Sequence, residues 1–252
     1  MRQLTLDQLG ELRLEGLKRA LKEQLAQPSF QDMSFEERFE LLIDAEAAYR
    51  DERRLATRIQ KAGLRQNARL EDADQRAVRS LDRALLDALS SCRWLREKRN
   101  VLLVGPTGVG KTFLASALTL KGCQQGFSAR FHRAPRLLHD LEIGRADGTY
   151  KNKLASIARV DLVILDDWLI TPLTSLQRRD LLEILDDRYD RRSTMICSQL
   201  PVEHWHEAIG DPTLADAILD RLIHNAYRLD IQGESLRKTK GLDGILDHNK
   251  KD

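Results

Sequence analysis

Apolar residues near the start of the chain recur at intervals of three to four residues, which is the period of an α-helix. One leucine-rich stripe covers residues 5–26; Thr5 begins a capping-box pattern, and Pro28 follows the stripe. A second apolar stripe follows Ser34, where the capping pattern is repeated. These patterns predict two helices and a small all-α N-terminal domain spanning residues 1–66.

The pattern changes in the rest of the chain. Residues 67–80 are polar and acidic, which is typical of a connector, and a helix is expected at 81–92. Beyond it, strands are predicted at 101–104, 129–132, 161–165 and 194–198, and helices at 111–124, 135–143, 175–189 and 212–224. This alternation predicts an α/β domain, residues 81–244, built on a parallel sheet that is covered on both faces. A polar tail, 245–252, follows it.

Composition adds little to this picture. The chain has 252 residues, 42% of them hydrophobic, and its 41 basic and 39 acidic residues nearly cancel, so whole-chain charge does not point to a partner. The three cysteines have no metal-ligand or redox spacing, which indicates free thiols in a reducing compartment. Neither a signal peptide nor an apolar stretch of about 18 residues is seen, so we expect a soluble, cytoplasmic protein.

The strongest chemical signal follows the strand predicted at 101–104. Residues 105–112 match the phosphate-binding pattern G-x-x-x-x-G-K-[ST], with the expected strand before it and helix after it. The loop backbone would cradle phosphates, Lys111 would reach the β- and γ-phosphates, and the Thr112 hydroxyl would bind Mg²⁺. The sequence therefore predicts a nucleoside triphosphate site formed by Gly105, Pro106, Thr107, Gly108, Val109, Gly110, Lys111 and Thr112.

Two carboxylates follow the strand predicted at 161–165. Asp166 is predicted to hold Mg²⁺, and Asp167 to orient and polarise the attacking water. The next strand ends in Ser198 and Gln199, and an amide there would lie between the second acid and the γ-phosphate. We prefer Gln199 for this role, with Ser198 second; a polar residue that only caps a turn explains the pattern equally well.

Two arginines further along are candidates for a role in hydrolysis. Arg221 lies late in a predicted amphipathic helix, where it would reach the γ-phosphate of a neighbouring subunit as an arginine finger. Arg237 follows a glycine turn at Gly233. The alternative for both is a solvated arginine without a catalytic role.

A basic stripe lies in the N-terminal part of the chain. Residues 50–69 hold seven basic residues against two acids, a local net charge of +5. Such a row can follow a phosphate backbone, and with few aromatic residues among them its binding would be largely independent of DNA sequence. A solvated helix face explains the row equally well. The candidate DNA-binding residues are Arg50, Arg54, Arg58, Lys61, Arg65 and Arg69.

With these residues in view, the chain resembles the IstB-like family, the helper ATPases of transposition. The resemblance covers nearly the whole chain and is carried by residues 105–115, 165–168, 198–201 and 233–237. A more distant likeness is to DnaC-type helicase loaders of the AAA+ initiator branch. The resemblance implies an AAA+ P-loop core with a five-stranded parallel sheet, a truncated lid, ATP with Mg²⁺, oligomers on double-stranded DNA, and an IstA-like transposase as partner.

The same resemblance implies roles for single residues. Asp166 would bind magnesium, Asp167 would be the catalytic acid, Gln199 would occupy the sensor-1 position and Arg221 would be the finger. Phe113 and Arg237 would join the nucleotide-binding set, Arg237 in a sensor-2-like motif. Asp167 stands where the commoner pair has Glu, so we expect slow hydrolysis.

Three functions are compatible with these motifs. The first is a helper protein that assembles on DNA with ATP, selects the target, stimulates a transposase and is disassembled by hydrolysis. The second is a replicative helicase loader, which keeps the core and changes the partner. The third is a monomeric small-molecule kinase, for which the sequence shows no lid or substrate-pocket signature.

Overall fold

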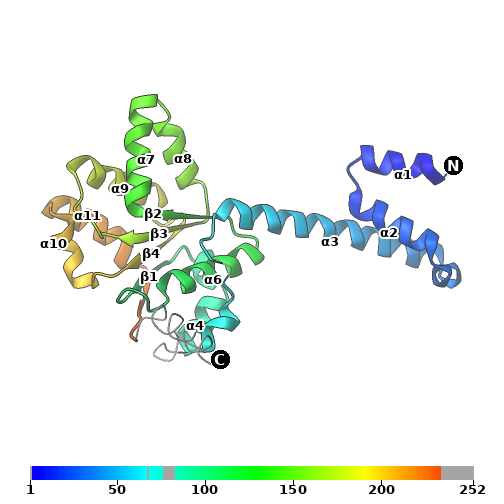
Figure 1. Cartoon of the computed structure of the whole chain (residues 1–252), viewed down its shortest axis with the longest axis horizontal. Helices are drawn as coiled ribbons and strands as arrows, with labels where there is room; N and C mark the ends of the chain where they lie inside the picture. The colour runs from blue at the N-terminus through cyan, green and yellow to red at the C-terminus, as the bar shows by residue number, and fades with distance from the viewer. Residues whose placement is uncertain (1, 67, 76–82, 234–252) are drawn as a thin grey trace, which may run out of the picture. The chain divides into compact units, whose positions relative to one another are not determined.

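The computed structural model describes residues 2–66, 68–75 and 83–233 of the chain (Figure 1). Backbone contacts divide the chain into two compact units, Met1–Thr57 and Arg58–Asp252. Among the described helices, none combines the length and the apolar character needed to cross a bilayer.

The first unit is helical, as predicted. It contains α1 (Arg2–Glu11), α2 (Glu15–Ala26), the 3₁₀ helix η1 (Pro28–Asp32) and most of α3 (Phe35–Ala62). The single helix expected at residues 5–26 was wrong, because the chain turns between α1 and α2, where Arg13 adopts a φ of +59°. Helical spacing of the leucines continues across this turn, so periodicity alone did not reveal it.

The start of α3 follows the predicted capping box at Ser34. The Ser34 hydroxyl accepts a hydrogen bond from the Glu37 backbone N–H (3.2 Å), and the Ser34 N–H donates to the Glu37 carboxylate (2.8 Å). Further along α3, the carboxylate of Glu46 is buried and accepts the backbone N–H of Leu17 at 3.0 Å. This bond joins α2 to α3 and satisfies one of the free N–H groups in the first turn of α2.

The second unit is built on a five-stranded parallel sheet, which confirms the predicted fold class. Its strand order is β2-β3-β4-β1-β5, and every neighbouring pair is parallel. The last strand was not predicted from the hydrophobic pattern, although the resemblance implied five strands. The strands are β1 (Asn100–Val104), β2 (Ala129–Arg133), β3 (Leu162–Trp168), β4 (Ser193–Ser198) and β5 (Ala226–Asp230).

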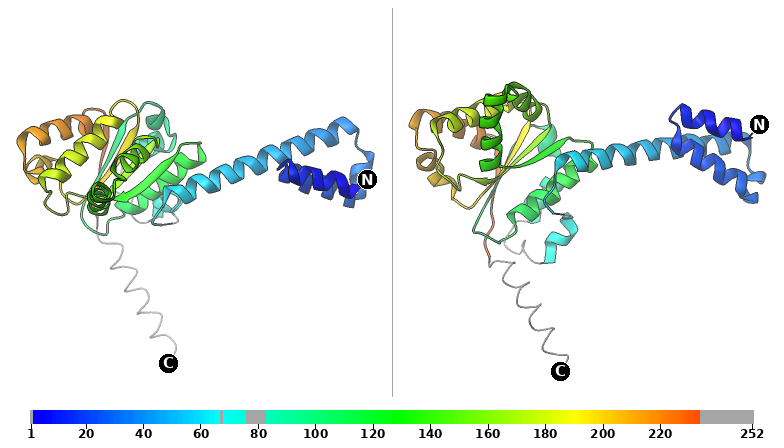
Figure 2. Two further views of the ribbon diagram at one scale, coloured as in Figure 1. Left: turned by 90° about the horizontal axis from the view of Figure 1, so that it is seen from above. Right: turned by 45° about the horizontal axis from the view of Figure 1, so that its top comes forward.

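Helices cover both faces of this sheet, as Figures 1 and 2 show. Leu102 and Val104 belong to the core shared with α7, α8, α9, α10 and α11, whereas Val101 and Leu103 point to the opposite face, which α6 covers. The bounds are η2 (Leu70–Gln75), α4 (Arg83–Ser90), α5 (Arg93–Arg96), α6 (Lys111–Gln124), α7 (Ala134–Asp147), α8 (Tyr150–Ala158), α9 (Ser175–Arg188), η3 (Val202–His204), α10 (Trp205–Ile209) and α11 (Pro212–Ile223).

Candidate nucleotide site

The loop that matches the phosphate-binding pattern lies at the carboxyl edge of the sheet. It connects the end of β1 to the start of α6, whose free N–H groups face the loop. Gly105, Gly108 and Gly110 have φ values of +154°, +87° and +103°, so the curled backbone uses conformations that other residues rarely adopt. The Gly105 N–H donates to the carbonyl of Ser198 (3.2 Å), which joins the loop to the end of β4.

Lys111 is held inside this loop. Its side chain is buried, and Nζ donates to the carbonyls of Gly105 (2.6 Å) and Pro106 (2.7 Å). These contacts hold the ammonium group in the hollow of the loop, where a phosphate oxygen would compete with the carbonyls for it. Of the other predicted loop residues, Val109 is buried and Phe113 is half-buried in the first turn of α6.

The two predicted magnesium ligands meet at the foot of the loop. The Thr112 hydroxyl donates to Oδ2 of Asp166 at 3.1 Å, and Asp166 is buried near the end of β3. Burial, together with the neighbouring charge of Asp167, raises the pKa of Asp166. A divalent cation would favour the charged carboxylate, and hydroxyl and carboxylate oxygens are the ligands that Mg²⁺ takes. These residues therefore fit a magnesium ion.

Asp167 adopts a left-handed backbone conformation, with a φ of +58°. Its N–H donates to the Asp166 carboxylate (3.0 Å), and its own carboxylate accepts Nε of Arg133 at 2.6 Å. Arg133 is the last residue of β2 and is in register with Asp166. Sequence reasoning missed Arg133; the signal was a basic residue at the end of the strand next to the acidic pair.

The structure separates the two candidates at the end of β4. Gln199 is exposed, and its Oε1 accepts the Thr107 hydroxyl of the phosphate loop at 2.5 Å. Ser198 is buried, and its hydroxyl accepts the N–H of Leu200 at 3.1 Å. Gln199 thus faces the phosphate loop, whereas Ser198 stabilises a local turn.

Arg65 lies beside the same site, which the sequence did not suggest. Its guanidinium is 3.8 Å from Oδ2 of Asp166. The prediction had placed Arg65 and Arg69 in the basic stripe, but α3 ends at Ala62, and Gly63 follows with a φ of +63°. Helical spacing therefore extends only as far as Lys61, because the chain leaves the helix before it reaches the last two arginines.

The rest of the stripe lies on α3 as predicted. Arg50 and Arg54, in the first unit, pair with Glu46 and Asp51 on the same helix. Arg58, in the second unit, donates from Nε to the Cys123 carbonyl at 3.0 Å.

Arg221 lies at the other end of β1 from the phosphate loop. Its carbonyl accepts the side chain of Asn100, the first residue of β1, and its guanidinium pairs with Asp186. A five-residue strand spans roughly 16 Å at about 3.3 Å per residue, so Arg221 does not reach the site in its own subunit. Arg237, the other candidate arginine, lies outside the described residues.

Comparison with known proteins identifies the family of this chain. A family model described as IstB-like ATP binding protein matches residues 7–243. The chain belongs to the IstB-like family. A relative named as an insertion sequence ATP-binding protein, from Sinorhizobium fredii (strain NBRC 101917 / NGR234), is 47% identical over 236 residues, which are 94% of this chain and 96% of the relative.

Solved structures support the AAA+ fold of this IstB-like chain. The crystal structure of DnaI matches 67% of the chain and 90% of its own length, with a TM-score of 0.55 and 22% identity. AMPPCP-bound DnaA from Aquifex aeolicus matches 74% of the chain and 56% of its own length, with a TM-score of 0.55 and 17% identity. At this identity the likeness concerns the fold alone, and it confirms the predicted AAA+ P-loop core.

Proposed function

We propose that this IstB-like protein is the ATP-dependent helper of an insertion sequence, which binds and hydrolyses ATP with Mg²⁺. The observation that carries the proposal is the contact of Thr112 with Asp166 directly beside Lys111, because it brings the oxygen ligands of a metal and the cation of a phosphate loop to one place. The name of the S. fredii relative supports the association with an insertion sequence.

The residues around this point support hydrolysis. Thr112 and Asp166 would hold Mg²⁺, which would supply positive charge to offset the charge of the phosphates. Asp167 polarises the attacking water once its carboxylate is released from Arg133, and the Gln199 amide orients the γ-phosphate. Because Asp167 is shorter than Glu and is already engaged by a guanidinium, hydrolysis is slow.

The site is completed by a second subunit. Arg221 cannot serve the ATP of its own chain, so it acts on the ATP of a neighbour after leaving Asp186. ATP would therefore lie between subunits and favour assembly. We place the assembly on double-stranded DNA in the cytoplasm, with the transposase of the same element as partner; hydrolysis then dismantles it.

Electron microscopy of the full chain with duplex DNA and a non-hydrolysable ATP analogue tests this proposal. We expect rings or spirals on DNA with the analogue and dispersed protein without it. Lys111→Ala removes the cation of the phosphate loop and should abolish nucleotide binding and assembly. Dispersed wild-type protein in the presence of both ligands would overturn the assembly step.

A second measurement addresses hydrolysis and the partner. Asp167→Asn should retain ATP binding and stay assembled, because the amide cannot accept a proton from water. Hydrolysis at the wild-type rate by this variant would contradict the role of Asp167. A pull-down with the transposase of the same insertion sequence is expected to succeed; capture of a replicative helicase instead would favour a helicase loader.

A further inference from the structure

A basic pocket lies at the amino edge of the sheet, away from the nucleotide site. Its volume is about 340 Å³, and it is formed by the end of α3, the start of β2 and the end of α8. Four of its eight lining residues are cationic and none is acidic. The eight lining residues are Arg58, Lys61, Ser128, Ala129, Arg130, Ser156, Arg159 and Val160.

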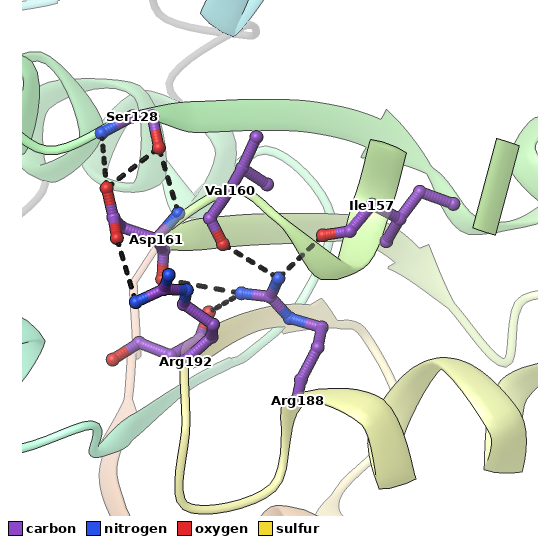
Figure 3. Close-up of polar contacts among 7 residues, drawn as sticks. Ser128, Ile157, Val160, Asp161, Arg188 and Arg192 are labelled. Atoms are coloured by element: carbon purple, nitrogen blue, oxygen red, sulfur yellow. Dashed lines mark hydrogen bonds and ion pairs between the residues drawn. The ribbon is translucent and has the colours of Figure 1, made fainter. Parts of the chain in front are cut away.

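Asp161 directly follows Val160, a lining residue of this pocket, and its negative charge is offset within the fold. Its carboxylate accepts both the N–H (2.9 Å) and the hydroxyl (2.8 Å) of Ser128, and it pairs with Arg192 at 3.3 Å (Figure 3). Its acceptor capacity is used within the fold, so it does not repel an anion in the pocket as an unpaired carboxylate would.

The carbonyl end of α8 is neutralised as well. Such an end carries partial negative charge, which would disfavour an anion. Here the buried guanidinium of Arg188 donates to the carbonyls of Ile157 (2.7 Å) and Val160 (2.9 Å), as Figure 3 shows. Burial of Arg188, together with the smaller effect of the Arg192 charge, lowers its pKa to about 9. This side chain therefore still carries its positive charge at neutral pH.

The cations of the pocket are available to a ligand. Within the part of the chain that the structure describes, the side chains of Lys61, Arg130 and Arg159 form no hydrogen bond or ion pair. Arg58 uses only Nε, on the Cys123 carbonyl. Neighbouring cations without counter-charges repel one another, and an anion between them removes that repulsion.

We propose that this pocket binds a phosphate of the DNA backbone, an inference that rests on the proposed function because it takes DNA as the partner. The lining offers guanidinium, ammonium and hydroxyl groups, with Ala129 and Val160 as its only apolar members and no aromatic residue on which a base could stack. Arg58 and Lys61 belong to the basic stripe of α3, and Arg130 and Arg159 add two contacts from the ATPase core.

The test measures duplex DNA binding by the full chain in the presence of a non-hydrolysable ATP analogue. Fluorescence anisotropy reports the affinity at salt concentrations from about 50 to 200 mM. The pocket variant is Arg130→Gln with Arg159→Gln. The control is Arg96→Gln with Arg179→Gln, which removes the same charge from two exposed arginines that do not line the pocket. Thermal unfolding and ATP-analogue binding are measured for each variant to confirm folding.

We expect the pocket variant to bind DNA about tenfold more weakly, with a slope of log affinity against log salt that is smaller by about 0.9, since one phosphate contact is lost. The control should match the wild type, and Arg130→Lys with Arg159→Lys should restore the slope. Lys61→Gln, at an exposed position on α3, should lower the slope by about 0.9 and gives a second measurement if the double variant does not fold.

The outcomes separate the two proposals. Wild-type protein that does not bind duplex DNA would overturn the proposed function. If the wild type binds and the pocket variants keep the affinity and slope of the control, the pocket assignment fails and the proposed function stands. Inorganic phosphate at millimolar concentration should compete weakly; if it binds the pocket tightly while DNA affinity is unchanged in the variants, the pocket belongs to a small anion.

Discussion

Gly105 provides a sharp test of the phosphate loop, because two different costs of a side chain at this position can be separated. Its φ is +154°, and a Cβ atom built there would lie 2.2 Å from the carbonyl oxygen of Ile231. That segment cannot move away freely, since the Ile231 N–H donates to the Val104 carbonyl at 2.7 Å. Gly105→Ala therefore meets both an unfavourable backbone conformation and a backbone atom.

The loss of unfolding free energy caused by Gly105→Ala can be compared with the loss at a glycine where only the backbone conformation is unfavourable. A left-handed conformation costs an alanine about 1–2 kcal/mol, and overpacking against the fold costs about 1–3 kcal/mol more. Gly126 has a φ of +94°, and a Cβ there would meet no atom within 4 Å. We expect Gly126→Ala to show only the first cost, so the two variants should differ by about 1–3 kcal/mol.

Urea unfolding of both variants measures this difference, and calorimetry measures ATP affinity. Gly105→Ala should also weaken ATP binding, because the Gly105 carbonyl holds Nζ of Lys111. Gly126 follows the end of α6 and should leave the affinity unchanged. Equal losses of unfolding free energy in the two variants, with equal ATP affinities, would refute the close contact between the loop and the segment after β5.

Three further predictions concern single side chains. Gln199→Ala should lower the steady-state hydrolysis rate about 10²-fold, the size expected for a lost preorganised donor, with little change in ATP affinity; equal losses in both would assign Gln199 to ground-state binding. Arg65→Gln should tighten Mg²⁺ binding in the presence of an ATP analogue by up to about fivefold, because the long contact of a half-exposed arginine with Asp166 contributes about 1 kcal/mol; weaker Mg²⁺ binding would show that Arg65 assists the phosphates instead. Burial of His132, together with the smaller effect of the Arg130 charge, lowers its pKa from 6.5 to about 4. As the pH falls, the unfolded chain therefore takes up this proton before the folded chain does, and stability that is present above pH 6.5 is lost as the pH falls towards 4. This loss is about 3 kcal/mol at most, and chemical unfolding at pH 7 and pH 4.5 should show it in the wild type but not in His132→Phe; parallel losses would exclude His132 as the cause.

Much of the AAA+ core could be predicted because its signals are local. The helix from Lys111 to Gln124 was predicted with its observed bounds, and the strand before it differs by one residue, since both depend on apolar runs interrupted by a glycine-rich loop. The short elements could not be predicted in this way. The last strand, Ala226–Asp230, has a mixed polar sequence and exists because β1 offers it a partner along its whole length.

The candidate site divides along the same line. Lys111, Thr112 and Asp166 were predicted because a phosphate and its metal require these residue types at defined positions on a strand and a loop, and the carboxyl edge of a parallel sheet brings them together. The pairing of Arg133 with Asp167, and the approach of Arg65 to Asp166, join residues far apart in sequence. The one local signal for Arg133 was its place at the end of a strand, and no period or spacing in the chain marks the approach of Arg65.

The sequence by itself therefore determined the class of fold, the phosphate loop and the two carboxylates near the end of β3, because each is specified by neighbours within one element or one turn. Only the tertiary structure decided which other charges face those groups. It placed Arg221 at the far end of β1, and it gathered Arg130 and Arg159 with Lys61 around one pocket. The physical reason is that the positions of side chains on different elements are set by how the sheet and helices pack, and electrostatic interactions depend on that distance rather than on separation along the chain.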